Sequence, residues 1–133
     1  MSMQNSKVLK IILGLCGLLM LIPGIMALVN PTGFVSRNGA DIVGDLVLLN
    51  DYRGTGGIML ASAIVMLLGI FHSRMAFTST VVAIAAHFSI AFGRLISLGM
   101  DGMPVKGQIA AMVVEFVLAG LAIFALTKYR EKE

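Results

Sequence analysis

Two charged side chains lie within runs of apolar residues that are long enough to cross a membrane. Arg94 lies near the end of one such run, and Glu115 lies inside the run that follows. Charged groups are costly in hydrocarbon, so they usually face the protein interior and pair or take part in function. The two residues could bind an anionic head group or a carboxylate, exchange a proton, or clamp two helices in register.

Other polar residues recur on the face of the helix that would carry Arg94. At 100° per residue, four side chains fall within an arc of about 80°: His87, Arg94, Ser97 and Asp101. In the next segment a stripe of small and polar residues is formed by Gln108, Ala111, Glu115, Ala119 and Ala122. We expect the two stripes to face each other across an antiparallel pair. With helix ends at Leu98 and Gln108, Arg94 and Glu115 lie roughly 6 and 10 Å below the outer boundary. We therefore predict that Arg94 contacts Glu115.

Two residues at the start of the second apolar segment lie at the same outer level and could extend this cluster. The complete set of candidate site residues is Asp51, Arg53, His87, Arg94, Ser97, Asp101 and Glu115. No catalytic role follows from their spacing. No spacing of cysteine, histidine and carboxylate residues is typical of a metal site, so we expect no metal and no cofactor. The single cysteine, Cys16, is interpreted as a small core or lipid-facing residue.

These residues must be positioned by membrane helices. The chain has 133 residues, of which 58% are hydrophobic and only 13% are charged, whereas soluble domains contain about 25% charged residues. Four apolar segments, near residues 8–29, 53–71, 76–98 and 108–127, can each cross a hydrocarbon core of about 30 Å. The sequence predicts one all-α domain over residues 1–133, an integral membrane four-helix bundle with a short interfacial segment between the first two helices. No basic patch is interleaved with aromatic residues, which argues against a nucleic-acid partner.

Local signals divide these segments. Pro23 and Gly24 should kink or end the first helix, and Asn30–Gly33 should form a turn. Residues 41–49 could form an amphipathic helix at the membrane interface, or a short strand. We expect Asn50 or Asp51 to cap the second helix, and Gly57 and Ala61 to form a small-residue packing face.

An even number of crossings places both chain ends on one side. That side would carry more basic residues, namely Lys7, Lys10, Arg74, Lys128, Arg130 and Lys132, than the other, which has Arg37, Arg53 and Lys106. The positive-inside rule then predicts that both termini are cytoplasmic.

Motifs spread along the chain resemble those of a family of small bacterial four-helix membrane proteins, the domain of unknown function four-three-four-five. The resembling features are Pro23-Gly24, Asn50-Asp51-x-Arg53-Gly54-x-x-Gly57, Gly93-Arg94-Leu95-x-Ser97, Asp101-Gly102-x-Pro104 and Glu115. The resemblance implies a four-helix fold in the bacterial inner membrane and a role for these polar positions. It implies no activity. The first loop departs from the pattern, because Asp41–Asp45 is more apolar than expected.

Three functions remain open. The protein could bind a membrane lipid or small molecule, or act as an accessory protein that joins a partner membrane subunit or a second copy of itself. It could be a proton-coupled transporter that uses Glu115 as the titrating group. It could also be a membrane enzyme on lipids, with His87 and Glu115 as an acid–base pair and Arg94 holding an anion.

Overall fold

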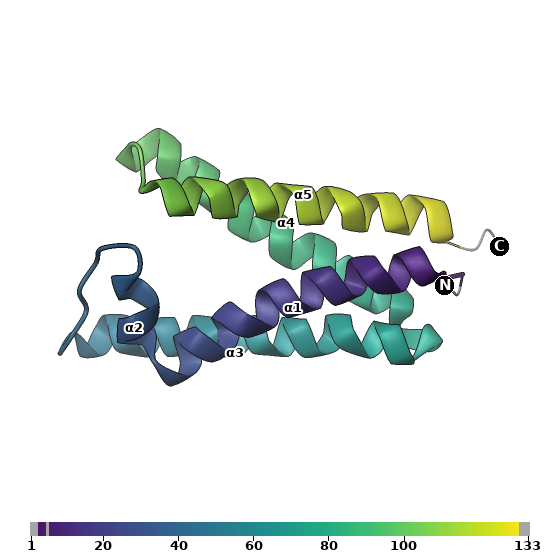
Figure 1. Cartoon of the computed structure of the whole chain (residues 1–133), viewed down its shortest axis with the longest axis horizontal. Helices are drawn as coiled ribbons and strands as arrows, with labels where there is room; N and C mark the ends of the chain where they lie inside the picture. The colour runs from purple at the N-terminus through teal and green to yellow at the C-terminus, as the bar shows by residue number, and fades with distance from the viewer. Residues whose placement is uncertain (1–2, 5, 131–133) are drawn as a thin grey trace.

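The residues that the structure describes form four long helices and two short ones. The structure is a computed structural model that describes residues 3–4 and 6–130. The elements in chain order are α1 (Lys7–Val29), α2 (Pro31–Ser36), α3 (Leu46–Phe71), the 3₁₀ turn η1 (Ser73–Met75), α4 (Ala76–Asp101) and α5 (Lys106–Tyr129) (Figure 1). Across this described part of the chain there is no strand, only an isolated bridge between Met3 and Arg130. The predicted all-α four-helix bundle is confirmed.

The four long helices have the length and apolarity of membrane spans. Mean hydropathy is 2.6 for α1, 2.0 for α3, 1.8 for the η1–α4 segment and 2.5 for α5. Many large apolar side chains point outward, among them Ile58 at 72% and Phe71 at 77% exposure. Such a surface would be unfavourable in water but suits contact with lipid. The chain is a multi-pass membrane protein.

The long helices form two pairs. α1 packs most extensively against α3, and α4 against α5. The pairs lie close together at the end that holds both termini and are separated at the opposite end, where α2 lies (Figure 1). The bridge between Met3 and Arg130 joins the two ends of the described chain. This divergence leaves space between the pairs at the end far from the termini.

A close backbone approach joins α1 to α3. A Cβ atom on Gly56 would lie 2.6 Å from the Leu28 nitrogen and 2.8 Å from the Gly24 oxygen. Gly57, which was predicted to provide this contact, has no such neighbour within 4 Å, and Ala61 is exposed. The predicted packing face was wrong, because the α3 residues that meet α1 lie on the face of Gly56 and Ala63. Glycine at position 56 lets the two helices touch through their backbones.

The segment before α3 differs from both predicted conformations. Asp41 forms a turn by accepting a hydrogen bond from the Val43 amide, and Gly44 has a φ of 80°. The Asp45 carboxylate then caps α3 through the Val47 and Leu48 amides, at 3.1 and 3.0 Å. The second helix therefore begins at Leu46, not at residue 53, and neither Asn50 nor Asp51 caps it. Residues 41–49 are a turn followed by the first turn of α3, and neither an interfacial helix nor a strand.

The other helices also extend beyond their predicted limits. α4 ends at Asp101 rather than at Leu98, and α5 begins at Lys106 and ends at Tyr129. α1 continues through Pro23 to Val29, so proline does not end it. After α1, the short helix α2 begins at Pro31, with the Asn30 side chain accepting a hydrogen bond from the Gly33 amide at 3.0 Å.

Candidate functional site

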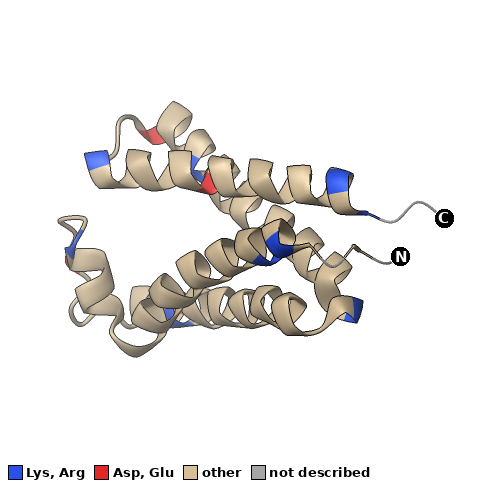
Figure 2. Cartoon of the chain, turned by 45° about the vertical axis from the view of Figure 1, so that its right-hand side comes forward, with Lys and Arg blue, Asp and Glu red and all other residues tan. Residues whose placement is uncertain are grey.

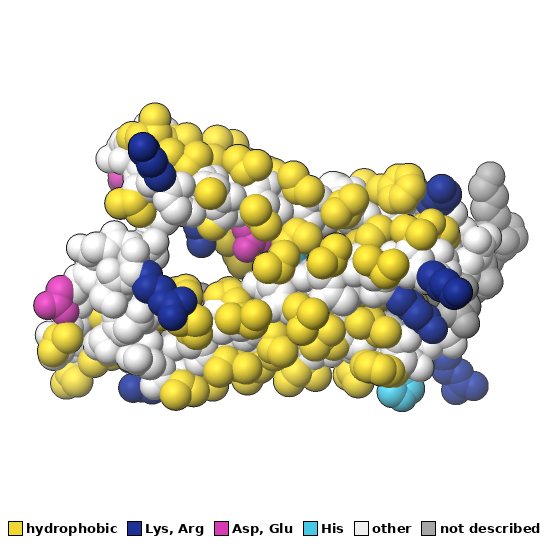
Figure 3. All heavy atoms as spheres, viewed as in Figure 1, with side chains coloured by type: hydrophobic (Ala, Val, Ile, Leu, Met, Phe, Trp, Pro, Cys, Tyr) yellow, Lys and Arg dark blue, Asp and Glu magenta, His cyan; other side chains and the backbone are white. Residues whose placement is uncertain are grey.

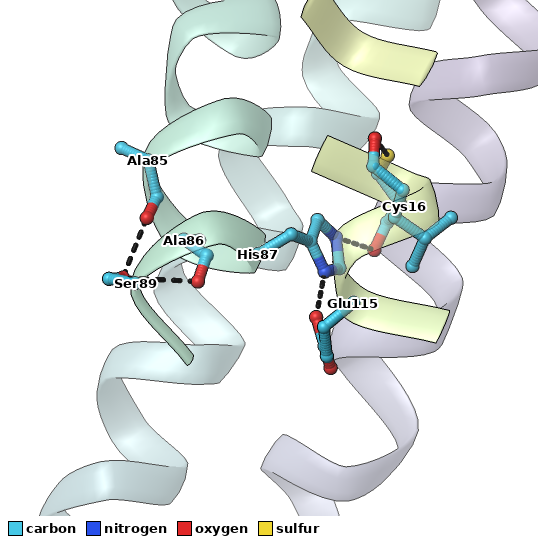
Figure 4. Close-up of polar contacts among 7 residues, drawn as sticks. Cys16, Ala85, Ala86, His87, Ser89 and Glu115 are labelled. Atoms are coloured by element: carbon cyan, nitrogen blue, oxygen red, sulfur yellow. Dashed lines mark hydrogen bonds and ion pairs between the residues drawn. The ribbon is translucent and has the colours of Figure 1, made fainter. Parts of the chain in front are cut away.

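The central polar contact of the bundle joins α4 to α5. His87 Nδ1 is hydrogen-bonded to Glu115 Oε2 (Figure 4). The histidine side chain is fully buried, whereas that of Glu115 is 14% exposed. Glu115 is the only acidic residue of α5. Most of the coloured Lys and Arg positions lie near the ends of helices (Figure 2). This contact replaces the predicted Arg94–Glu115 pair.

The register of the two helices explains why the predicted pair was wrong. Seven residues separate His87 from Arg94 on α4, and seven separate Gln108 from Glu115 on α5. In an antiparallel pair, placing His87 opposite Glu115 therefore places Arg94 opposite Gln108. The contacts agree, since Arg94 Nη1 donates to the Gln108 carbonyl at 3.3 Å. These two contacts imply that α4, which ends at Asp101, extends past the level at which α5 begins, so α5 begins deeper in the bundle than equal helix ends would imply.

The protons of the His87–Glu115 pair can be counted from its partners. His87 Nε2 lies 3.2 Å from the backbone oxygen of Cys16 on α1. A carbonyl oxygen only accepts hydrogen bonds, so Nε2 must be protonated and donate. One further proton then lies between Nδ1 and Glu115 Oε2, giving either an imidazolium and a carboxylate or two neutral groups. In both cases the pair has no net charge, which explains how an apolar bundle holds it.

Arg94 keeps most of its hydrogen-bonding capacity. Its side chain is half-buried, and its bond to the Gln108 carbonyl uses one of five N–H donors. Within residues 3–4 and 6–130, the contact of His87 with Glu115 is the only one between a basic and an acidic side chain at salt-bridge distance, so Arg94 has no acidic partner there. The guanidinium can therefore bind an anion.

The remaining predicted site residues lie apart from this contact. Ser97 donates to Asp101 Oδ2 at 2.7 Å, and both are exposed near the end of α4. Arg53 donates to the Leu28 carbonyl at 2.7 Å and so joins α3 to the end of α1. Asp51 is exposed. The seven predicted residues therefore divide into an inner group (His87, Arg94, Glu115) and exposed outer residues.

A cavity of about 530 Å³ lies between the two helix pairs. It appears as the hollow on the face shown in Figure 3, with an acidic and a basic side chain at its wall. Its polar and charged lining residues are Asn38, Tyr52, Thr55, Arg94, Gln108 and Glu115. Most of the other lining residues are apolar, and they come from all four long helices. Small-molecule sites have this size and composition.

Sequence reasoning missed several of these lining residues. Asn38, Tyr52 and Thr55 carried no pattern that would place them beside Arg94, although Tyr52 and Phe34 stack edge-on at 6.4 Å between ring centres. The backbone of Cys16 gave no signal either. The stripe on α5 was informative: Gln108, Ala111 and Glu115 line the cavity, and Ala119 and Ala122 are buried.

The N-terminus of α5 lies at the edge of the cavity. Gly107 and Gln108 line it, and the capping position, Val105, supplies no side-chain hydrogen bond. No acidic residue occupies the first turn. The partial positive charge at the N-terminus of this 24-residue helix is therefore not offset by an acidic side chain of its own first turn. Together with Arg94 it makes this part of the cavity electropositive. In the described part of the chain, no three histidine, cysteine or acidic residues are grouped as metal ligands.

Comparison with known proteins identifies the family but not a function. Residues 8–126 match the family described as "Domain of unknown function (DUF4345)". No curated protein and no solved structure matches the chain significantly. The match covers α3 and α4 completely, nearly all of α1 and α5, and the whole cavity lining.

Proposed function

Since this chain belongs to the DUF4345 family, whose description assigns no activity, we propose a function from the geometry of its cavity. The protein binds an amphiphilic membrane ligand whose acidic head group lies against Arg94. The observation that most directly supports this is the guanidinium of Arg94, which lies in the wall of an open cavity and has no acidic partner among the residues that the structure describes.

The charge at the site favours an acidic group. Arginine donates two parallel hydrogen bonds to a phosphate or a carboxylate, and such charge-assisted bonds are about twice as strong as neutral ones. The uncapped N-terminus of α5 adds backbone N–H groups near Gly107, and helix N-termini commonly bind anions. An acidic head group would compensate both features.

The walls of the cavity favour a ligand with an apolar part. Ile22, Ala27 and Val114 are among the apolar side chains that line it. The volume of about 530 Å³ is ample for a head group and adjoining carbons. Long acyl chains would extend from the cavity into the surrounding lipid. A membrane lipid meets these requirements.

We also propose a location and an orientation. The family resemblance and the four apolar helices support the bacterial inner membrane. Basic residues are concentrated at the end of the bundle that holds both termini, namely Lys7, Lys10, Arg74, Lys128 and Arg130. Lys132, which was also predicted to add to this positive charge, lies outside the described residues. By the positive-inside rule both termini are cytoplasmic and the cavity lies in the outer half of the membrane. Reporters fused to each end should both report the cytoplasmic side.

Replacing Arg94 by glutamine should weaken lipid binding. Loss of a hydrogen bond to a charged group costs about 1.5–3 kcal/mol, which corresponds to a roughly 10- to 100-fold lower affinity. Native mass spectrometry of protein in nanodiscs that contain phosphatidylglycerol and phosphatidylethanolamine measures the retained lipid. The matched control is Arg37→Gln, because Arg37 is exposed at the same end and does not line the cavity. Equal lipid retention by Arg94→Gln and the wild-type protein would contradict the proposal.

A second candidate, proton-coupled transport, is favoured by the proton shared between His87 and Glu115. Glu115 also lines the cavity, so a ligand could affect this proton directly. Proteoliposomes should then show proton flux driven by a lipid or solute gradient, and Glu115→Gln should abolish it. Unchanged flux in that variant would reject this candidate.

The geometry does not favour the third candidate, a lipid enzyme with His87 in acid–base catalysis. Both ring nitrogens of His87 are already hydrogen-bonded, and its side chain does not line the cavity. A catalytic acid or base must reach the proton that it transfers.

A further inference from the structure

Proline in α1 provides a hydrogen-bond acceptor at the cavity. Pro23 lies inside the helix and has no N–H group. The carbonyl of Leu19, four residues earlier, therefore lacks its usual helical donor. Leu19 and Pro23 both line the cavity. An acceptor without its helical partner in apolar surroundings favours a ligand that donates hydrogen bonds.

Glu115 on α5 provides a second acceptor in the wall of the same cavity. Its Oε2 atom is bonded to His87, and no hydrogen bond to Oε1 is formed within the described part of the chain. Because Glu115 lines the cavity and is 14% exposed, Oε1 can accept from a ligand. A carboxylate oxygen in a largely apolar site attracts a positively charged donor most strongly.

The two acceptors lie at similar depth. His87 connects Glu115 to the backbone oxygen of Cys16 on α1. Leu19 follows Cys16 by three residues, which is about 4.5 Å along the helix. Along the bundle axis, the depths of Glu115 and the Leu19 carbonyl therefore differ by about one helical turn, and both residues line the same cavity.

The anion-binding and acceptor features differ in position. On α4 and α5 the Arg94–Gln108 contact is about two turns nearer the α2 end than the His87–Glu115 contact. The electropositive region is thus nearer the α2 end, and the acceptors are deeper. Resting on the proposed function, we infer that the ligand is zwitterionic. Its acidic group binds Arg94 and the α5 N-terminus, and its primary ammonium group binds the Leu19 carbonyl and Glu115. Phosphoethanolamine, free or as a lipid head group, has this chemistry.

The test compares two lipids that differ in the ammonium group. Nanodiscs contain equal amounts of phosphatidylethanolamine and phosphatidylglycerol with matched acyl chains, and native mass spectrometry gives the ratio of the two lipids retained. The wild-type protein should retain phosphatidylethanolamine in roughly tenfold preference, the value of one hydrogen bond to a charged group. Glu115→Gln should bring the ratio close to one.

Pro23→Ala is a second variant that does not depend on the His87–Glu115 pair. Alanine restores the N–H donor to the Leu19 carbonyl and is a good helix former, so α1 should remain folded. This variant should also lose the preference. Ile25→Ala is the control, because Ile25 is exposed on α1 and does not line the cavity; its ratio should equal that of the wild-type protein.

The outcomes separate this inference from the proposed function. Equal retention of both lipids by the wild-type protein, with a loss of both in Arg94→Gln, would overturn the inference that the ligand is zwitterionic. It would still support the proposed function, the binding of an acidic head group at Arg94. Retention of neither lipid would overturn both. Added phosphoethanolamine distinguishes the source of the group: displacement of the lipid indicates a free zwitterion, and no displacement alongside the tenfold preference indicates the lipid. Either result supports the inference.

Discussion

Replacing His87 by alanine is expected to lower the free energy of unfolding by about 3–5 kcal/mol, the usual cost of removing one partner from a buried ion pair. The substitution leaves the Glu115 carboxyl group without its partner inside the bundle. It also removes the hydrogen bond from Nε2 to the Cys16 carbonyl, so both hydrogen bonds that His87 makes from α4, one to α1 and one to α5, are lost. Unfolding by sodium dodecyl sulfate in mixed micelles, followed by circular dichroism, measures the change.

A double variant distinguishes the effect of leaving one polar group without its partner from the effect of changed side-chain packing. His87→Leu combined with Glu115→Leu removes both polar groups and leaves neither unpaired, and such replacements are often neutral or stabilising. We expect the double variant to be more stable than His87→Ala, and its cost to be smaller than the sum of the single His87→Leu and Glu115→Leu changes. Additive single effects would show that the two residues do not act as a pair.

Enlarging Gly56 should destabilise the contact between α1 and α3. An added Cβ would lie 2.6 Å from the Leu28 nitrogen, and a backbone atom cannot move aside as the end of a flexible side chain can. Gly56→Ala should cost about 1–3 kcal/mol, and Gly56→Leu should cost more because it forces the helices apart. The same unfolding assay measures both variants.

Two neighbouring glycines on α3 serve as controls. Gly54 and Gly57 have no atoms within 4 Å of an added Cβ outside their own helix. Alanine at either position should leave stability unchanged or raise it by up to about 1 kcal/mol, the difference in helix propensity. A loss in Gly57→Ala as large as that in Gly56→Ala would indicate that lipid contact, rather than the crossing of α1 and α3, dominates.

Local sequence features explain why some predictions succeeded. Long apolar runs specify membrane helices because hydrocarbon requires backbone groups to bond internally. The α5 stripe from Gln108 to Ala122 was identified from periodicity alone, because small and polar residues avoid the lipid face. The positions of His87 and Arg94 on the inner face of α4 followed in the same way. The helix limits were less accurate, since capping by Asp45 competes with plausible alternatives at Asn50 and Asp51.

The partner of Glu115 could not be derived in this way. Both His87 and Arg94 lie on the correct face, seven residues apart, and the choice between them depends on a shift of two turns between α4 and α5. The assumption that the two helices end at the same level suggested Arg94 as the partner of Glu115. In the structure α4 extends past the level at which α5 begins, which shifts the register and brings His87 opposite Glu115. Such a shift depends on packing between segments and leaves no periodic signal.

By itself the sequence determined four membrane helices, chain ends on one side, and an inner polar face on α4 and α5, because each depends on local hydrophobicity and helical period. Only the tertiary structure decided that Glu115 pairs with His87, that Arg94 has no acidic partner among the described residues, and that the cavity lies between the helix pairs. These features depend on the α1–α3 crossing at Gly56 and on the α4–α5 register, which bring together residues far apart in the chain.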